Sequence, residues 1–221
     1  MFDNDLDKYQ DDLPPSPDTQ PPDVLISQDT RRANRIPPGQ SRTRKWPVLD
    51  AAGPPRIDLS HWRLEIDGLV PNKISLTWDE LTQLPQIQVF ADFHCVTRWS
   101  RLGNLWRGVS TRTLLELAGG PAPGAHFALI HAYDFGWTTN LPLDALLAPD
   151  ALVTTHHDGQ PLSPEHGAPA RLIIPQLYAW KSAKWIGGIE LIEHDKAGFW
   201  ERNGYHMNGD PWQEERFGGW S

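Results

Sequence analysis

The chain contains a single cysteine, in the stretch ADFHCVTRWS of residues 91–100. Its neighbours His94, Arg98 and Arg101 are cationic or polar, and such groups lower the pKa of a thiol and favour the thiolate. A thiolate is a soft ligand that suits a transition metal, and the position lies where a predicted strand enters a loop. Cys95 is therefore either a metal ligand or a small buried hydrophobe, because a lone cysteine beside a strand often serves packing alone.

A second polar group lies around a turn between two apolar stretches in residues 166–191. It contains Arg171, Lys181, Ser182 and Lys184. Basic and hydroxyl side chains at strand ends suit an anion such as a phosphate. An ordinary solvated loop is the alternative interpretation.

A third group is the basic segment with Arg42, Arg44, Lys45 and Trp46. On its own, such a charge run is either a solvated face or a recognition segment. Its distance in sequence from Cys95 leaves open whether the two meet in space.

The histidines do not indicate a zinc site. His156 and His157 are adjacent, so on a strand they point to opposite faces. His131, His166 and His206 lie far apart in the sequence, and the chain has neither HxxxH nor CxxC spacing.

Composition divides the chain at about residue 30. Residues 1–30 carry eight Asp, one Lys and several prolines, a net charge of −7, which leaves 20 acidic against 19 basic residues for the remainder. Such a segment buries too little apolar surface to offset its ordering entropy. We therefore expect a flexible, disordered arm over residues 1–30 and one domain over residues 31–221, without the basic footprint of a nucleic-acid-binding protein.

Nothing in the sequence predicts a membrane span or a secretion signal. No run approaches the ~18 apolar residues that a span needs, and the N-terminus has no apolar core of a signal peptide. A single cysteine also excludes an internal disulfide. We expect a cytoplasmic protein.

The apolar patterns predict an α+β domain rich in strands. Strands are expected within residues 62–70, 74–77, 86–93, 126–134, 151–162, 170–175 and 183–195. Gly187–Gly188 suggests a bulge in the last strand. Helices are expected after Thr77, which has Glu80 at capping-box spacing, within residues 110–120 after Ser110 or Thr111, and late in residues 136–150. No βαβ rhythm or glycine-rich phosphate loop is present.

Eight stretches together resemble the molybdopterin-binding domain of the sulfite oxidase family, most closely its small bacterial members without haem. They are NRIPPGQ (34–40), WPVLD (46–50), WRLEIDGLV (62–70), HCVTRWS (94–100), STRTLLE (110–116), TTNLPL (138–143), HGAPARLIIP (166–175) with YAWKSAKWIGGIEL (178–191), and GFWERNGYHMNGDPW (198–212). They occur in the family's order and cover nearly everything from residue 34 onward. The resemblance implies the family's mixed-sheet fold.

The resemblance also implies a cofactor. The family binds one molybdenum, held by the dithiolene sulfurs of a pyranopterin and by one cysteine thiolate, which corresponds to Cys95. The cofactor-binding positions that the resemblance suggests are Arg44, Trp46, His131, His166, Arg171, Ser182, Ala183 and Lys184. Arg171 and residues 182–184 match the part that grips the phosphate of the pterin, and no haem is implied.

For the reaction, the resemblance implies an oxidoreductase that transfers an oxygen atom to or from a small substrate such as a sulfite-like anion, a sulfoxide or an N-oxide. A separate electron carrier would be its partner. Arg98 and Arg101 are the candidates for holding an anionic substrate, with Tyr133 or Tyr178 beside them. A pterin-binding module without turnover and a hydrolase with Cys95 as nucleophile are the alternatives.

Overall fold

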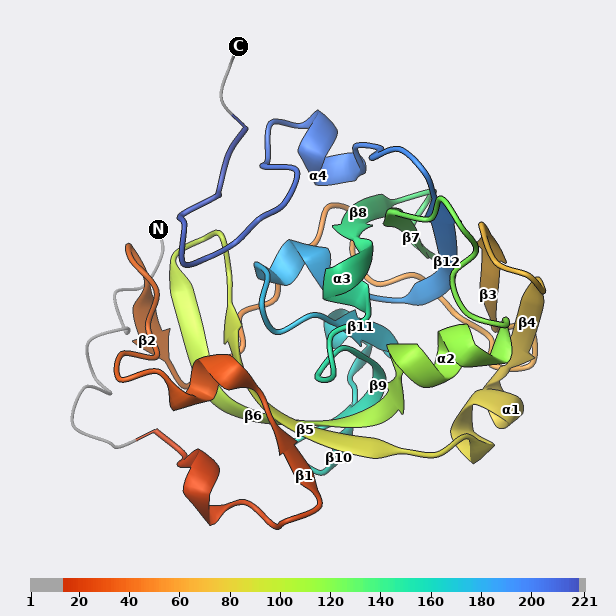
Figure 1. The fold of residues 1–221 in the computed structure, drawn as a ribbon. Helices are drawn as coiled ribbons and strands as arrows, with labels where there is room; N and C mark the ends of the chain where they lie inside the picture. Colours follow the sequence, from red (N-terminus) through yellow and green to blue (C-terminus); the bar gives the residue numbers. More distant parts are fainter. Residues whose placement is uncertain (1–13, 219–221) are drawn as a thin grey trace.

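Two mixed β-sheets share one hydrophobic core and carry a few short helices at their edges (Figure 1). The computed structural model describes residues 14–218. Within these residues no helix has the length and apolar character needed to cross a bilayer.

The first sheet has seven strands. They are β1 (Val24–Ile26), β2 (Ser41–Thr43), β5 (Ile87–His94), β6 (Trp99–Ser110), β9 (Leu152–His157), β10 (Gln160–Pro161) and β11 (Arg171–Ile173). Their order is β1-β5-β6-β9-β10, with β2 also paired to β6 and β11 to β9. β1 runs parallel to β5 and β2 parallel to β6, whereas the other pairs are antiparallel.

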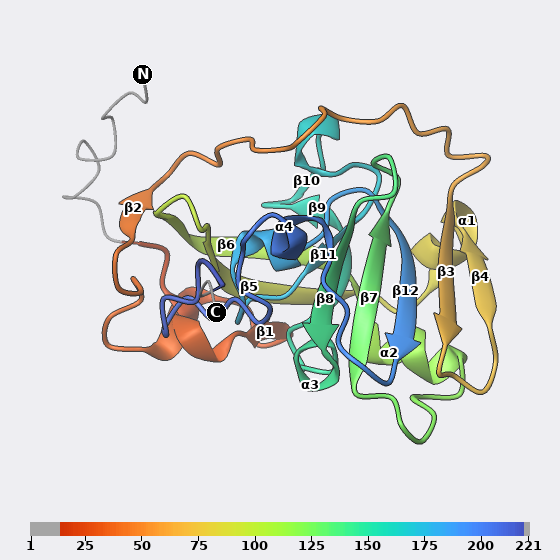
Figure 2. The same ribbon diagram turned by 90° about the horizontal axis from the view of Figure 1, so that it is seen from above.

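The second sheet has five strands in the order β4-β3-β12-β7-β8, seen side by side in Figure 2. They are β3 (Arg63–Gly68), β4 (Ile74–Thr77), β7 (Phe127–Ala132), β8 (Thr138–Pro142) and β12 (Ile186–Ile192). β12 lies parallel to β3 and antiparallel to β7, and its register shifts between Ile186 and Gly188. The bulge predicted at the paired glycines is thereby confirmed.

The helices are short, and the first two begin where their capping residues predict. They are α1 (Trp78–Gln83), α2 (Thr111–Leu117), α3 (Leu143–Leu146) and α4 (Phe199–Arg202). Thr77 and Glu80 form the predicted capping box of α1, and the Ser110 side chain accepts a hydrogen bond from the amide of Arg112 at the start of α2. The predicted α+β class and the single domain are confirmed.

The expected disordered arm is wrong for residues 14–30. Val24 to Ile26 form β1, and the Ser27 hydroxyl donates a 2.6 Å hydrogen bond to Asp150. Thr30 is buried as well. Long-range pairing with β5 offsets an ordering entropy that local composition could not offset. The rest of the predicted arm, residues 1–13, lies outside the described residues.

The sequence patterns also missed β2, β8 and most notably the twelve-residue β6. Five alternate residues of β6 are buried, from Ser100 to Gly108, but Ser100 and Asn104 among them are polar. Asn104 donates hydrogen bonds to the carbonyl oxygens of Ala91 and Arg101. Because buried polar side chains replace apolar ones, the alternation that marks a half-buried strand is hidden in β6.

The core consists of two clusters. The larger one joins residues of both sheets and α2, for example Leu64, Ile130, Val153 and Leu114. The smaller one gathers around β5 and β6 and includes Cys95, Tyr178 and several aromatic rings. The functional cavity adjoins this second, aromatic cluster.

Candidate functional site

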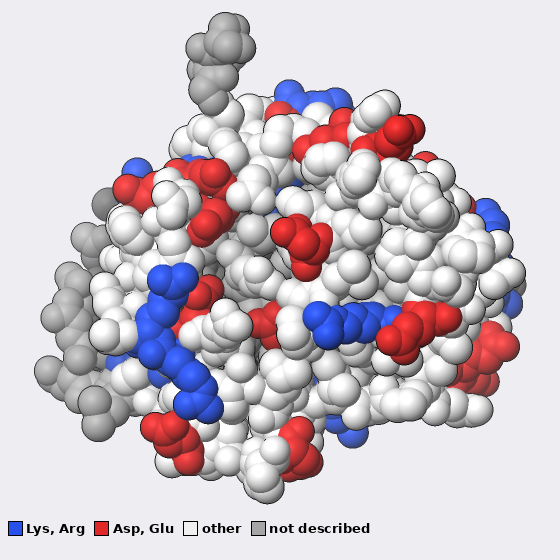
Figure 3. Space-filling model, viewed as in Figure 1, with Lys and Arg blue, Asp and Glu red and all other residues white. Residues whose placement is uncertain are grey.

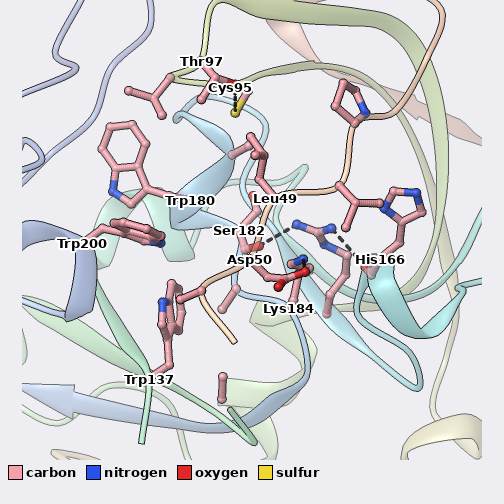
Figure 4. A pocket seen from close by; sticks show the side chains of 18 of the residues that line it. Leu49, Asp50, Cys95, Thr97, Trp137, His166, Trp180, Ser182, Lys184 and Trp200 are labelled. Carbon is pink, nitrogen blue, oxygen red and sulfur yellow. Dashed lines mark hydrogen bonds and ion pairs between the residues drawn. The ribbon is translucent and has the colours of Figure 1, made fainter. Parts of the chain in front are cut away.

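A cavity of about 190 Å³ joins parts of the chain that are far apart in sequence. Its lining comes from within residues 46–51, 93–99, 132–137, 166–171, 179–185 and 200–205. Figure 4 shows Cys95 and Thr97 at one end of the cavity, Trp180 and Trp200 along one side, and Asp50 and Lys184 farther from the thiol. The cavity therefore has an aromatic part near the thiol and a charged part away from it.

Cys95 occupies the turn between β5 and β6. Its amide donates a 2.9 Å hydrogen bond to the Trp99 carbonyl oxygen, and its own carbonyl oxygen accepts one from the Arg98 amide at 3.0 Å. Arg98 closes this turn with φ of 73°, in the left-handed region. The Thr97 hydroxyl donates to the Cys95 Sγ at 3.2 Å. The turn thus presents a nearly buried thiol to the cavity.

The expectation of a thiol with a lowered pKa is wrong for the protein alone. Burial raises the pKa of Cys95, and this effect outweighs the hydrogen bond from Thr97 and the charge of Arg216, which lower it. His94 offers no help, because its Nδ1 faces the Ser100 hydroxyl at 2.8 Å and burial lowers the His94 pKa to about 4. A buried neutral thiol is a poor free nucleophile, yet a coordinated metal deprotonates a thiol outright.

Arg171, the first residue of β11, places a buried cation against the cavity. Its Nη2 donates to the Ser182 carbonyl oxygen at 2.7 Å and its Nη1 to the His166 carbonyl oxygen at 3.1 Å. Burial lowers the pKa of Arg171 to about 9. Among residues 14–218 no carboxylate forms an ion pair with this guanidinium, so its charge is left for an anion.

Trp46 and His166 stack on each other beside Arg171. Their ring centroids are 3.8 Å apart at an interplanar angle of 5°, and the Arg171 guanidinium lies 5.5 Å from the Trp46 ring centroid. Burial and the neighbouring Arg171 lower the pKa of His166 to about 4. His166 is therefore a neutral, flat group at neutral pH and can donate or accept a hydrogen bond.

Lys184 adds a second cation to the same part of the cavity. Its Nζ lies 3.4 Å from Asp50 Oδ2 and donates to the Glu165 carbonyl oxygen at 3.0 Å. Burial and Arg171 lower the pKa of Lys184 to about 8. The neighbouring Ser182 and Ala183 also line the cavity, although the Ser182 hydroxyl accepts from the Ile174 amide at 2.9 Å. Arg171 and Lys184 together make this part suited to an anion such as a phosphate.

Lys181, the fourth polar residue predicted near this turn, does not line the cavity. It is fully buried, and its Nζ contacts Glu201 Oε1 at 2.7 Å and Asn140 Oδ1 at 2.6 Å. The same Glu201 oxygen accepts a 2.9 Å hydrogen bond from the Trp180 indole. Lys181 therefore helps to hold α4 and Trp180 in place.

Three predicted site arginines lie elsewhere. Arg98 is exposed on the turn, and Arg44 and Arg101 line a separate cavity near β2. Arg101 forms a 2.7 Å ion pair with Asp158 and contacts His157 Nε2 at 2.9 Å. The side chains of Arg98, Arg44 and Arg101 are absent from the lining of the cavity that contains Cys95.

His131 is also outside the cavity. It lies on β7, where its Nε2 contacts Glu190 of the adjacent β12 at 2.9 Å. Across residues 14–218, no three His, Cys, Asp or Glu side chains gather closely enough to hold a metal ion. A metal at this site would therefore depend on Cys95 and on ligands brought by a cofactor.

Among residues 14–218 the tyrosine that lines the cavity is Tyr205, which the sequence did not suggest. Tyr133 instead exchanges hydrogen bonds with the backbone of Arg63, and Tyr178 is buried behind Trp180. Tyr205 stacks on Trp200 at 5.0 Å between centroids. Burial and nearby Cys95 raise the pKa of Tyr205, so its phenol stays a hydrogen-bond donor. The aromatic stretch after β12 was the only available signal.

The surface seen in Figure 3 carries acidic and basic side chains intermixed, with one stripe of Lys and Arg on the side of β2. A field of a single sign therefore does not extend over this face. The two cations that line the cavity are Arg171, which is buried, and Lys184, which is partly buried.

Comparisons with known proteins agree with this geometry. The family model described as oxidoreductase molybdopterin binding domain matches residues 51–200. The chain is 46% identical over 187 residues to an uncharacterized oxidoreductase, YuiH, of Bacillus subtilis, covering 84% of this chain and 93% of that protein. It is 33% identical over 153 residues to a putative protein-methionine-sulfoxide reductase subunit, YedZ1, of Azospira oryzae, covering 69% of this chain and 57% of that protein.

Two further matches are more distant. The catalytic subunit of the protein-methionine-sulfoxide reductase MsrP of Campylobacter jejuni is 26% identical over 215 residues, covering 88% of this chain and 71% of that protein. The crystal structure of the sulfane dehydrogenase SoxCD from Paracoccus pantotrophus matches 71% of this chain and 44% of its own with a TM-score of 0.63. At 20% identity, that likeness shows the fold alone.

Proposed function

We propose that this chain, which belongs to the family of oxidoreductases with a molybdopterin-binding domain, removes an oxygen atom from a neutral sulfoxide or N-oxide. Family membership makes it a molybdopterin-dependent oxidoreductase. The choice of substrate and of reaction direction is the proposal, and the aromatic lining near Cys95 is the observation that carries it.

The donor set of the cavity fits a molybdenum–pyranopterin with a phosphate. Cys95 would supply the single thiolate to the metal, and Arg171 and Lys184 would hold the phosphate, with Trp46 and His166 against the pterin. Arg171 is a buried cation without a carboxylate partner among residues 14–218, so a bound anion would remove a standing electrostatic penalty. When bound, this cofactor supplies two-electron oxygen-atom transfer.

The part of the cavity near the thiol favours a neutral substrate over sulfite. Trp180, Trp200 and Tyr205 line it, whereas the two lining cations contact residues of the other part. Arg98 and Arg101, the candidates for gripping an anion, are not in the lining. An anion buried against aromatic rings with no cation in the lining there would be costly, but a neutral S–O or N–O dipole can lie there with one donor.

The reduction balances with two electrons and two protons. The S–O bond of the sulfoxide breaks, the sulfur is reduced to a thioether, and the oxygen leaves as water. A separate electron carrier would deliver the electrons. The YedZ1 relative is described as a subunit, which supports a partner protein in this role. The Tyr205 phenol would donate a hydrogen bond to the substrate oxygen and so orient it, and the surrounding indoles would exclude water.

Elemental and pterin analysis followed by two assays tests the proposal. Protein from a host that makes the cofactor should contain about one molybdenum per chain, as a single cysteine ligand requires. It should oxidise reduced benzyl viologen with dimethyl sulfoxide or methionine sulfoxide faster than it reduces ferricyanide with sulfite. Faster sulfite oxidation would contradict the proposed substrate. Loaded protein that is inactive in both assays would instead be the pterin-binding module.

A cysteine hydrolase is the less favoured alternative, because Cys95 is buried with a raised pKa and His94 faces Ser100. Hydrolytic activity that survives removal of molybdenum would support it. The cytoplasmic location expected from the sequence stays a prediction, which fractionation of cells would test.

A further inference from the structure

The turn that carries Cys95 is held by residues from both ends of the chain. Gln40 Nε2 donates to the Cys95 carbonyl oxygen at 3.0 Å, and the Ser41 amide donates to the Arg98 carbonyl oxygen at 2.9 Å. From the C-terminal side, Arg216 Nη1 donates to the Val96 carbonyl oxygen at 2.8 Å. These donors lie outside the residues that match the family model, which are 51–200.

Arg216 also ties the N-terminal segment to the turn. Its Nη2 donates to the carbonyl oxygens of Pro38 at 3.1 Å and Gly39 at 3.3 Å, and its guanidinium lies 5.1 Å from the ring centroid of Tyr178. The Arg216 side chain is only 6% exposed. One buried guanidinium thus bridges two backbone segments more than 50 residues apart in sequence, because its planar fork can donate in two directions at once.

The charge of Arg216 is only weakly compensated. Within residues 14–218 its donors go to carbonyl oxygens, and its ion-pair partner is Glu214, at 3.8 Å, whose side chain is half exposed. Carbonyl oxygens satisfy the N–H groups without neutralising the cation. A positive charge held behind the Cys95 turn stabilises negative charge on the sulfur, since electrostatic interactions are strong in a poorly solvated interior.

We propose that Arg216 is a positioning residue that fixes the Cys95 turn and stabilises the thiolate ligand electrostatically. This inference rests on the proposed function, because the ligand role of Cys95 belongs to it. The positioning part concerns the chain alone, however, and can be measured without cofactor. Arg216 touches the turn but is absent from the cavity lining, so it would act through Cys95 and not on the substrate.

Amide hydrogen exchange of the full-length, cofactor-free chain tests the positioning. In Arg216→Gln the amides of Cys95 and Arg98, which close the turn, should exchange about 10-fold faster or more, because loss of a hydrogen bond from a charged donor makes local opening of the turn easier. Arg202→Gln is the matched control, since Arg202 lies on α4 with an exposed bond to the Ala197 carbonyl oxygen. Unchanged exchange of the turn in Arg216→Gln would overturn the positioning role.

The loaded enzyme tests the electrostatic part. Arg216→Gln should lower the molybdenum reduction potential, because a cation that favours the electron-rich state is gone. It should also reduce kcat about 10-fold with a smaller change in KM. Arg216→Lys keeps the charge but cannot bridge both segments, so it should retain most of the potential while the turn exchanges faster. A wild-type potential in Arg216→Gln would refute the electrostatic role.

These measurements separate the two proposals. If the wild-type chain binds no molybdenum, the proposed function fails, while the exchange result still decides the positioning role. If Arg216→Gln does not fold, Arg216→Lys serves for both measurements: wild-type exchange in that variant would count against the bridge, and faster exchange with a retained potential would support it.

Discussion

The two parts of the cavity differ in how the chain builds them. Most of the charged part comes from one stretch, with His166, Arg171 and Lys184 within 19 residues of each other around β11, and Trp46 and Asp50 join it from the segment before β3. The part near the thiol combines Cys95 from the β5–β6 turn, Trp180 from the loop before β12, and Trp200 and Tyr205 from the C-terminal region. The charged part suits a group common to a whole family, and the assembled part suits a particular substrate. Changes in the two parts should therefore have different consequences.

The largest effect should follow from Cys95→Ser. Serine is a harder and less acidic ligand than a thiol, so turnover should fall by at least about 100-fold, the upper range for disturbance of a metal site. Pterin content should fall less, because the charged part remains. Metal analysis and viologen assays measure the two quantities. Thr97→Val, which removes only the hydrogen bond to Sγ, is the control with a smaller loss. Full turnover in Cys95→Ser would contradict the ligand role.

Arg171→Met, in the charged part, should weaken cofactor retention but stabilise the cofactor-free chain. Cofactor retention should fall about 10-fold to 100-fold, because the buried cation for the phosphate is lost. The cofactor-free chain should become more stable by about 1 kcal/mol or more, since an uncompensated buried charge is replaced by an apolar side chain. Pterin release and thermal unfolding measure these changes. Lower stability of the cofactor-free variant would show that Arg171 mainly supports the fold.

Tyr205→Phe should act on the thiol part alone. Loss of one preorganised donor to a reacting oxygen lowers kcat by about 100-fold, whereas the unchanged aromatic ring should leave KM and pterin content nearly the same. Steady-state kinetics with a sulfoxide distinguish the two parameters. Tyr133→Phe, at a tyrosine whose hydroxyl bonds to Arg63 outside the cavity, is the matched control. Equal effects of both variants would remove Tyr205 from the proposed mechanism.

The smallest effect should be a dependence of phosphate binding on pH, which arises from Lys184. Its pKa is lowered to about 8, so the cofactor-free chain should bind inorganic phosphate more tightly below pH 8 and more weakly above it. The free energy of unfolding should depend on pH in the opposite direction from phosphate binding. The unfolded chain binds the proton up to its ordinary pKa near 10.5, so stability should rise with pH between about 8 and 10.5.

Calorimetry with phosphate at pH 7 and pH 9 measures the binding, and Lys184→Arg should flatten the profile because arginine stays charged over this range. A wild-type affinity that does not change between the two pH values would assign the phosphate contact to Arg171 alone.

The sequence predicted the charged part of the cavity better than the aromatic part. Arg171 and Lys184 lie within one motif, so their spacing alone placed them together. Tyr205 could not be chosen over Tyr133 or Tyr178, since only the packing of its ring on Trp180 and Trp200 in the folded chain places it in the cavity lining. For the same reason the sequence placed Arg98 and Arg101 wrongly in the site. Both are near Cys95 in sequence, but their side chains do not line the cavity.

The fold shows a similar division. β3, β5, β7, β9 and β12 follow apolar patterns that are visible locally, and the capping box of α1 is a local signal as well. β1 and β2 are three residues each and depend on parallel partners more than 50 residues away, so no local pattern could reveal them. Propensity and periodicity describe elements, whereas pairing at this distance is decided by the whole core.

The hydrogen bonds that hold the Cys95 turn also predict the order in which parts of the chain fold. Arg216 reaches Val96 across 120 residues, and β1 joins β5 across more than 60. Contacts so distant along the chain carry a large loop-closure entropy and form slowly, so we expect both chain ends to dock last. Until then the side of the cavity that Trp46 and Tyr205 line would be exposed to solvent. A cofactor as large as a pyranopterin would thus enter its cavity more easily before the two ends dock than afterwards.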